Sequence, residues 1–120
     1  MNLSYLLDEH VPRYLKAEIA RRERGLNVWR IGESAAPPLS TPDPQLLQWC
    51  ETVGCILVTS NRRSMPVHLA DHLSSGRHAP GIFILDPMMS VADTADHLVL
   101  VAIASFPGEY RDSIWFLPFV

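Results

Sequence analysis

Short apolar runs alternate with amphipathic stretches along the chain, and the pattern is typical of an α/β fold. The apolar runs predict strands at 3–7, 27–31, 56–59, 81–85 and 113–120. The stretches between them predict helices at 12–24, 43–54, 66–75 and 90–106. Such alternation favours parallel strands covered by helices on both faces. We therefore expect a three-layer α/β/α sandwich with a mostly parallel central sheet of about five strands.

The predicted helices carry apolar residues at helical spacing and end at typical breakers. Pro12 suits the first turn of the first helix, and Gly25 is the expected cap at its end. Asp43 is a candidate N-cap with Pro44 at the first helical position. Pro118 suits an edge strand, where a missing N–H donor is tolerated. The longest helix is expected to face the core with Val91, Ala95, Leu98, Val99, Ala102, Ile103 and Phe106.

Composition narrows the class of protein. A chain of 120 residues with 48% hydrophobic and 19% charged residues predicts a single globular domain, 1–120. No apolar run approaches the roughly 20 residues that span a bilayer, and we expect a cytoplasmic protein that contacts no membrane. Cys50 and Cys55 have no further Cys or spaced His pair beside them, so we interpret them as buried apolar residues rather than zinc ligands. A net charge of −3 argues against binding nucleic acid by bulk positive charge.

Polar side chains gather where the predicted strands end. Asp8 and Glu9 follow the first strand, Asp86 follows the fourth, and Asp43 begins the second helix. The third strand ends in Thr59, Ser60 and Asn61. Ligands of open α/β folds bind outside the carboxyl ends of the strands. Clustered carboxylates there predict a site for Mg²⁺ or Mn²⁺, which supports attack of an activated water on a phosphodiester.

Each of these residues has a structural alternative. Asp43 would also serve as a helix cap, and Asp86 before Pro87 as a turn residue or as the first cap of the next helix. Glu9 would also face solvent, and Asn61 would also form a turn. Asp8 is the strongest functional candidate, because a carboxylate directly follows a buried strand.

Two stretches resemble PIN and PIN-like domains. They are DPQLLQWCETVGCILVTSNRR at 43–63 and LLDEHVP at 6–12. The resemblance implies a metal-dependent ribonuclease, with Asp8 and Asp43 as metal-binding acids and Cys50 in place of a small residue. Many such proteins are toxins of bacterial toxin–antitoxin pairs, which implies an RNA substrate and a small antitoxin partner. Thr59 and Asn61 stand at the family's Thr-x-Asp motif, so Asn61 replaces an acid. Arg62, Arg63 and Ser64 stand where the family often has an aromatic residue.

Several alternatives stay open at this point. Asn61 would also suit a catalytically inactive PIN-like module that binds nucleic acid or protein. Arg62 and Arg63, considered together with His68, His72, Arg77 and His78, would contact RNA phosphates or form a solvated surface. A phosphoacceptor domain is disfavoured because Lys16 is the single lysine, and a nucleotide-binding enzyme because no glycine-rich loop follows a strand. The apolar segment 114–120 would form a homodimer contact or a buried edge strand.

Overall fold

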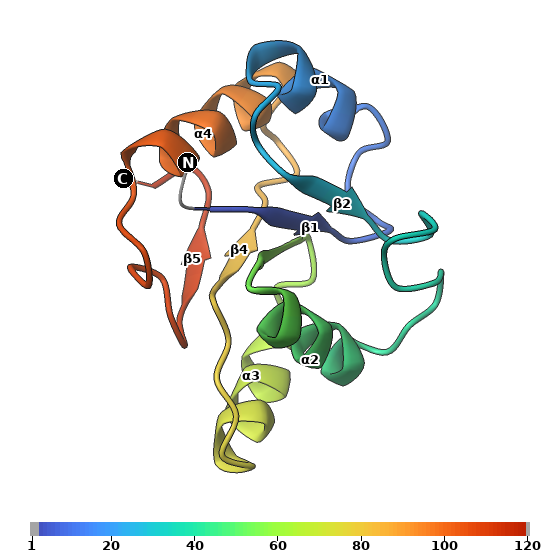
Figure 1. Ribbon diagram of the computed structural model, residues 1–120, viewed down its shortest axis with the longest axis vertical. Helices are drawn as coiled ribbons and strands as arrows, with labels where there is room; N and C mark the ends of the chain where they lie inside the picture. The colour runs from blue at the N-terminus through green and yellow to red at the C-terminus, as the bar shows by residue number, and fades with distance from the viewer. Residues whose placement is uncertain (1–2, 120) are drawn as a thin grey trace.

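The computed structural model describes residues 3–119, which form a sheet between two pairs of helices (Figure 1). The first half of the chain forms β1 (Tyr5–Leu7), α1 (Leu15–Arg22), β2 (Val28–Arg30), α2 (Asp43–Val53) and β3 (Ile56–Thr59). The second half forms α3 (Met65–Ser74), β4 (Ile82–Ile84), α4 (Val91–Ala104) and β5 (Ile114–Phe116). The predicted α/β fold class is confirmed.

The sheet has the strand order β2-β1-β3-β4-β5, and every neighbouring pair is parallel. Tyr5 pairs with Val28 on one side and with Ile56 on the other, so β1 lies inside the sheet. All strands therefore end at the same edge, and the order of the chain changes direction around β1 and β3. This edge is where an open α/β sheet places a ligand site.

Alternating side chains of the strands supply two cores. Tyr5, Leu7 and Phe83 pack on one face against α1 and α4, and Tyr5 donates a hydrogen bond from its hydroxyl to the carbonyl of Leu98 at 2.7 Å. Leu6 and Leu57 pack on the other face against α2 and α3. Figure 1 shows the sheet between these two helix pairs. The alternation follows from the two-residue period of a strand.

The ends of several elements differ from the sequence predictions. Helix α1 begins at Leu15 rather than at Pro12, because 8–14 form successive turns, and it ends at Arg22 with Glu23 rather than Gly25 as C-cap. Helix α4 ends at Ala104. Ile103 and Phe106 are 58% and 74% exposed, so the prediction that these two residues face the core was wrong.

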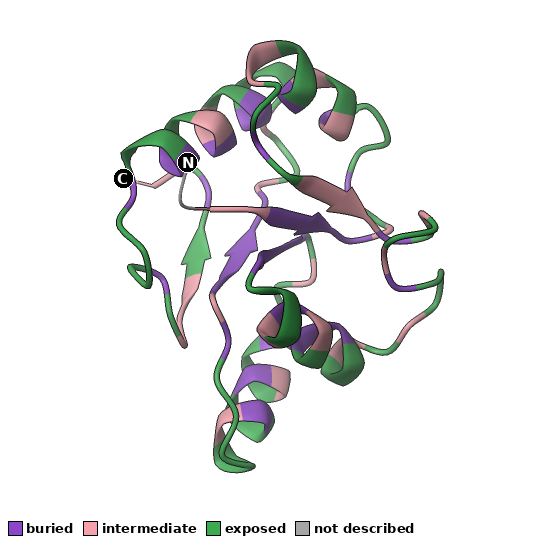
Figure 2. Cartoon of the chain, viewed as in Figure 1, coloured by how far each residue is buried: buried purple, intermediate pink, exposed green. Residues whose placement is uncertain are grey.

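The last strand is shorter than predicted and lies at the edge of the sheet. Strand β5 spans Ile114–Phe116, and Pro118 follows it after a cis peptide bond. Val120, the predicted end of this strand, lies outside the described residues. Figure 2 shows buried inner strands and a largely exposed β5. Within 3–119, no helix is long and apolar enough to cross a membrane.

Candidate functional site

Asp8 is a buried carboxylate at the carboxyl end of β1, where its side chain is only 6% exposed. Its Oδ1 accepts a hydrogen bond from the backbone N–H of Glu9 at 2.7 Å. Its Oδ2 accepts a second bond from the Thr59 hydroxyl at 2.8 Å. A carboxylate can be buried at modest cost only when it is hydrogen-bonded in this way. The two bonds therefore fix the orientation of Asp8.

Thr59 connects the end of β3 to the end of β1. Its side chain is fully buried, and its hydroxyl donates to Asp8 while accepting the backbone N–H of Asn61 at 3.1 Å. One hydroxyl thus serves both as donor and as acceptor. This contact holds the turn that carries Asn61 beside Asp8.

Asp43 does not cap its helix through its side chain, although the sequence permits that role. Helix α2 begins at Asp43 with Pro42 as N-cap and no side-chain cap bond. The Asp43 Oδ2 instead accepts a hydrogen bond from the Asn61 Nδ2 at 2.8 Å. The carboxylate of Asp43 is therefore directed to the end of β3.

Asn61 has an orientation that its neighbours define. Its Oδ1 accepts the Ser64 backbone N–H at 3.2 Å, and its Nδ2 also donates to the Ser64 hydroxyl at 2.6 Å. The amide group consequently presents its NH₂ to Asp43. Asn61 forms a turn, as one alternative predicted, and it also binds a candidate site carboxylate.

These residues line one hollow, which we call the acidic hollow. Its volume is about 330 Å³, and its lining is Asp8, Glu9, His10, Ser40, Thr41, Pro42, Asp43 and Asn61. Glu9 is partly exposed, and its Oε1 accepts the Ser40 backbone N–H at 2.8 Å, which joins the end of β1 to the loop before α2. The structure thus brings together Asp8, Glu9, Asp43 and Asn61, as predicted.

Asp86 lies elsewhere along the same edge of the sheet. Its Oδ1 accepts the Met88 backbone N–H at 2.8 Å, which is the turn role that the sequence also permits. It borders a separate hollow of about 230 Å³, which we call the aromatic hollow and which is lined by Arg62, Ile84, Leu85, Asp86, Phe116 and Leu117. Ser60 and Arg63 are exposed and line neither hollow.

The basic residues considered with Arg62 and Arg63 fall into two groups. His68 lies beside the site, with its Nε2 3.6 Å from Asp43 Oδ2. His72, Arg77 and His78 lie around Glu51 of α2.

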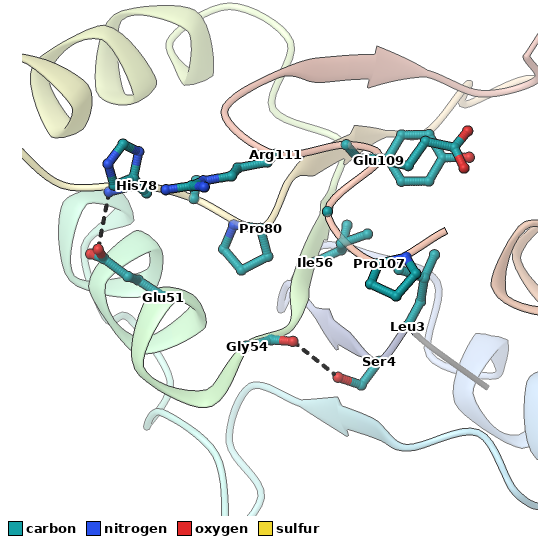
Figure 3. A pocket seen from close by; sticks show the side chains of 13 residues that line it. Leu3, Ser4, Glu51, Gly54, Ile56, His78, Pro80, Pro107, Glu109 and Arg111 are labelled. Atoms are coloured by element: carbon teal, nitrogen blue, oxygen red, sulfur yellow. Dashed lines mark hydrogen bonds between the residues drawn. The ribbon is translucent and has the colours of Figure 1, made fainter. Parts of the chain in front are cut away.

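A third hollow of about 260 Å³ lies where the strands begin, and Figure 3 shows Glu51, His78 and Arg111 on its wall. The His78 backbone N–H donates to Glu51 there. This hollow is at the end of the sheet opposite to Asp8.

The acidic hollow offers carboxylates but no dense cluster of metal ligands among the described residues. Among residues 3–119, no group of three His, Cys, Asp or Glu side chains is close enough to hold a metal ion. Mg²⁺ in proteins often keeps several waters and binds one or two carboxylates together with substrate phosphates. Asp8 and Asp43 supply two such carboxylates in one hollow. These carboxylates are the residues that could hold Mg²⁺ or Mn²⁺.

Some residues of the site had not been identified from the sequence. Ser40 and Ser64 fix Glu9 and Asn61 through the contacts described above. Phe116 borders the aromatic hollow although it is far from the motifs in sequence. The signal for Ser64 is its place three residues after Asn61 in a turn, whereas Phe116 carries no local signal.

Comparison of the chain with protein-family models, with curated proteins and with solved structures gives no match. The resemblance to PIN-like domains therefore rests on the two stretches quoted above.

Proposed function

We propose that the chain is a metal-dependent endoribonuclease of PIN-like type that acts in the cytoplasm. The proposal rests on one observation above all: Asp8, Asp43 and Asn61 come from three separate segments and line one hollow at the carboxyl edge of a parallel sheet. Open α/β folds place their ligands at this edge. Oxygen-rich side chains there suit hard divalent cations and phosphate chemistry.

The residues of the acidic hollow would each do a defined task. Asp8, held by Thr59 and by the Glu9 amide, presents a fixed negative charge for the cation. Asp43, whose Oδ2 accepts a hydrogen bond from Asn61, would supply a second carboxylate to the cation. When bound, Mg²⁺ or Mn²⁺ supplies Lewis-acid polarisation of the phosphodiester and lowers the pKa of water. Glu9 adds negative charge on the rim of the hollow.

The proposed biological role is that of a toxin controlled by a small antitoxin protein. This part rests on the PIN-like resemblance of 43–63 and LLDEHVP. A partner that covers the acidic hollow would keep RNA away from Asp8.

A second candidate function is a PIN-like module that binds nucleic acid or protein without cleaving it. One observation favours this alternative. The Asn61 amide donates directly to Asp43, so a hydrogen bond from a neutral group occupies a carboxylate oxygen that a cation would otherwise bind. The two functions differ in whether cleavage depends on metal.

The test is cleavage of a mixed-sequence single-stranded RNA by the purified chain in Mn²⁺, in Mg²⁺ and in EDTA. We expect cleavage with metal and none in EDTA. Asp8→Asn should lower the rate more than about 100-fold, because changes in groups that only support metal ligands already cost 10- to 100-fold. Asp71→Asn, a change of an exposed carboxylate on α3, is the matched control and should keep full activity.

Absence of cleavage by folded wild type, together with no Mn²⁺ binding by calorimetry, would reject the nuclease and leave the binding module. Cleavage that persists in Asp8→Asn would show that another site, or a contaminant, is responsible.

A further inference from the structure

The aromatic hollow combines three kinds of group at the end of the sheet. Its floor is apolar and buried, with Ile84 and Leu117 only 1% and 3% exposed. Arg62, Asp86 and Phe116, which are more exposed, also line it. These three come from the loop after β3, the end of β4 and the end of β5.

Phe116 is exposed where its neighbours on the same face are covered. Phe116 pairs with Ile84 in the sheet, so its side chain lies on the same face as Ile84. Helices α2 and α3 pack against that face over the inner strands. The ring is nevertheless 51% exposed. A half-exposed ring beside a hollow is a surface on which a nucleic-acid base can stack.

The two charged groups on the rim are available to a ligand. The Arg62 backbone N–H donates to the Ser60 carbonyl, and within residues 3–119 the Arg62 guanidinium forms no ion pair with a carboxylate. The Asp86 Oδ1 accepts the Met88 N–H, which leaves Oδ2 as an acceptor. Guanidinium suits a phosphate, and a carboxylate oxygen suits the N–H donors of a base.

The aromatic hollow lies beside the acidic hollow. Arg62 directly follows Asn61, and the Leu85 N–H donates to the Thr59 carbonyl at 2.9 Å. Strands β1 and β4 are separated by β3 alone, so their ends are roughly 10 Å apart. One RNA strand could therefore reach both hollows.

We propose that the aromatic hollow binds a single base of single-stranded RNA next to the acidic hollow, and this inference rests on the proposed function. The base stacks on Phe116, its phosphate contacts Arg62, and Asp86 accepts hydrogen bonds from the base edge. A guanine, whose N1–H and N2–H₂ are adjacent donors, fits Asp86 best. Uracil has one donor, its N3–H, flanked by two carbonyl oxygens that a carboxylate repels, and it fits least well.

The test measures binding without cleavage. Fluorescence anisotropy in EDTA at low salt would compare a labelled short oligouridine with the same strand carrying one guanosine. We expect wild type to prefer the guanosine strand. Phe116→Leu, which keeps an apolar side chain but removes the ring, should weaken binding roughly 5- to 100-fold. Phe106→Ala removes a 74% exposed ring that does not border this hollow and should leave the affinity unchanged.

Asp86→Asn tests the base preference separately. It should reduce the preference for guanosine over uridine and leave the affinity for oligouridine nearly unchanged. Equal affinity of wild type for both strands would overturn the assignment of Asp86. Equal affinity of wild type and Phe116→Leu would overturn the stacking site.

The inference and the proposed function can fail independently. Binding that depends on Phe116 in a chain that never cleaves RNA would reject the nuclease and keep the base site. Metal-dependent cleavage by a chain whose RNA affinity does not change in Phe116→Leu would support the nuclease and reject the base site.

Discussion

Asn61 places a neutral hydrogen-bond donor beside a carboxylate of the acidic hollow. Its NH₂ group lies 2.8 Å from a carboxylate oxygen of Asp43, and its carbonyl oxygen accepts from the Ser64 backbone. An aspartate in this place would set two negative charges against each other. Such a pair is tolerated when a cation lies between the carboxylates or when one of them takes up a proton.

Asn61→Asp should therefore make stability depend on metal. In EDTA at neutral pH we expect a loss of about 1–2 kcal/mol in the free energy of unfolding, because a hydrogen bond to a charged group is replaced by repulsion. Mn²⁺ should recover much of this loss and should bind more tightly than to wild type. Thermal unfolding with and without Mn²⁺, with calorimetry of Mn²⁺ binding, measures both effects.

Asn61→Ala is the control for that substitution, since it removes the hydrogen bond without adding charge. If Mn²⁺ raises the unfolding temperature of Asn61→Ala and of Asn61→Asp equally, Asp43 and the introduced carboxylate do not share a cation.

At the scale of elements, the hollow is created by contacts between strand ends that are distant in sequence. The Thr59 hydroxyl joins β3 to β1, and the Ser40 N–H joins the loop before α2 to Glu9. Neither helix α1 nor helix α3 contributes a residue to the lining. The sheet edge and its loops therefore carry the site.

Thr59→Val tests the junction between β1 and β3. The substitution keeps the shape of the side chain but leaves Asp8 Oδ2 without its donor and the Asn61 N–H without its acceptor. We expect a loss of about 1–3 kcal/mol in urea unfolding, the usual cost of an unsatisfied buried polar group. Thr52→Val, at an exposed position on α2, should change stability by less than about 0.5 kcal/mol. A loss in Thr59→Val no greater than that of the control would contradict the role of this contact.

The order and type of the elements were predictable, because apolar runs of strand length and helical stripes are local signals. The convergence of Asp8, Asp43 and Asn61 followed from the rule that parallel strands end at one edge. The same rule did not predict that Asp86 lies apart from these residues, because the distance between them depends on the width of the sheet between β1 and β4. The exposure of Ile103 and Phe106 was not predictable either, because it depends on whether another part of the chain packs against them.

At the scale of the whole molecule, the two ends of the sheet differ in character. The carboxyl ends of the strands carry the acidic and aromatic hollows. At the opposite end, ion pairs and hydrogen bonds connect α2, the segment before β4 and the turn before β5. Asp112 accepts the Ala79 N–H and lies 2.8 Å from the His78 Nδ1, and Glu51 accepts the His78 N–H.

These contacts should stabilise the protein at neutral pH and should weaken when the carboxylates of Glu51 and Asp112 take up protons in acid. The His78 N–H, with His72 and Arg77 nearby, lowers the pKa of Glu51 below its ordinary 4.5. Burial alone would raise the pKa of Asp112, but the Ala79 N–H, His78 and Arg111 lower it below 3.8. The unfolded chain then binds more protons in acid, so this stabilisation is complete above the ordinary pKa values of the two groups and is lost as the pH falls through their lowered values in the folded protein. Thermal unfolding at several pH values measures this loss.

Asp112→Asn should flatten the dependence of the unfolding temperature on acid pH, since it removes one of the two titrating groups. Asp71→Asn, at an exposed position, should keep the full dependence. Equal curves for wild type and Asp112→Asn would show that the acid sensitivity arises elsewhere.

The parallel order of the strands has a consequence for how the chain reaches its native state. Strand β1 pairs on one side with β2 and on the other with β3, and the bond between Asp8 and Thr59 spans 51 residues. Contacts between distant residues slow folding, because the intervening chain must be ordered first. During synthesis the acidic hollow cannot exist until β3 has emerged and docked. A nascent chain therefore carries no assembled site, and any activity of this hollow reports a sheet that has already folded through β3.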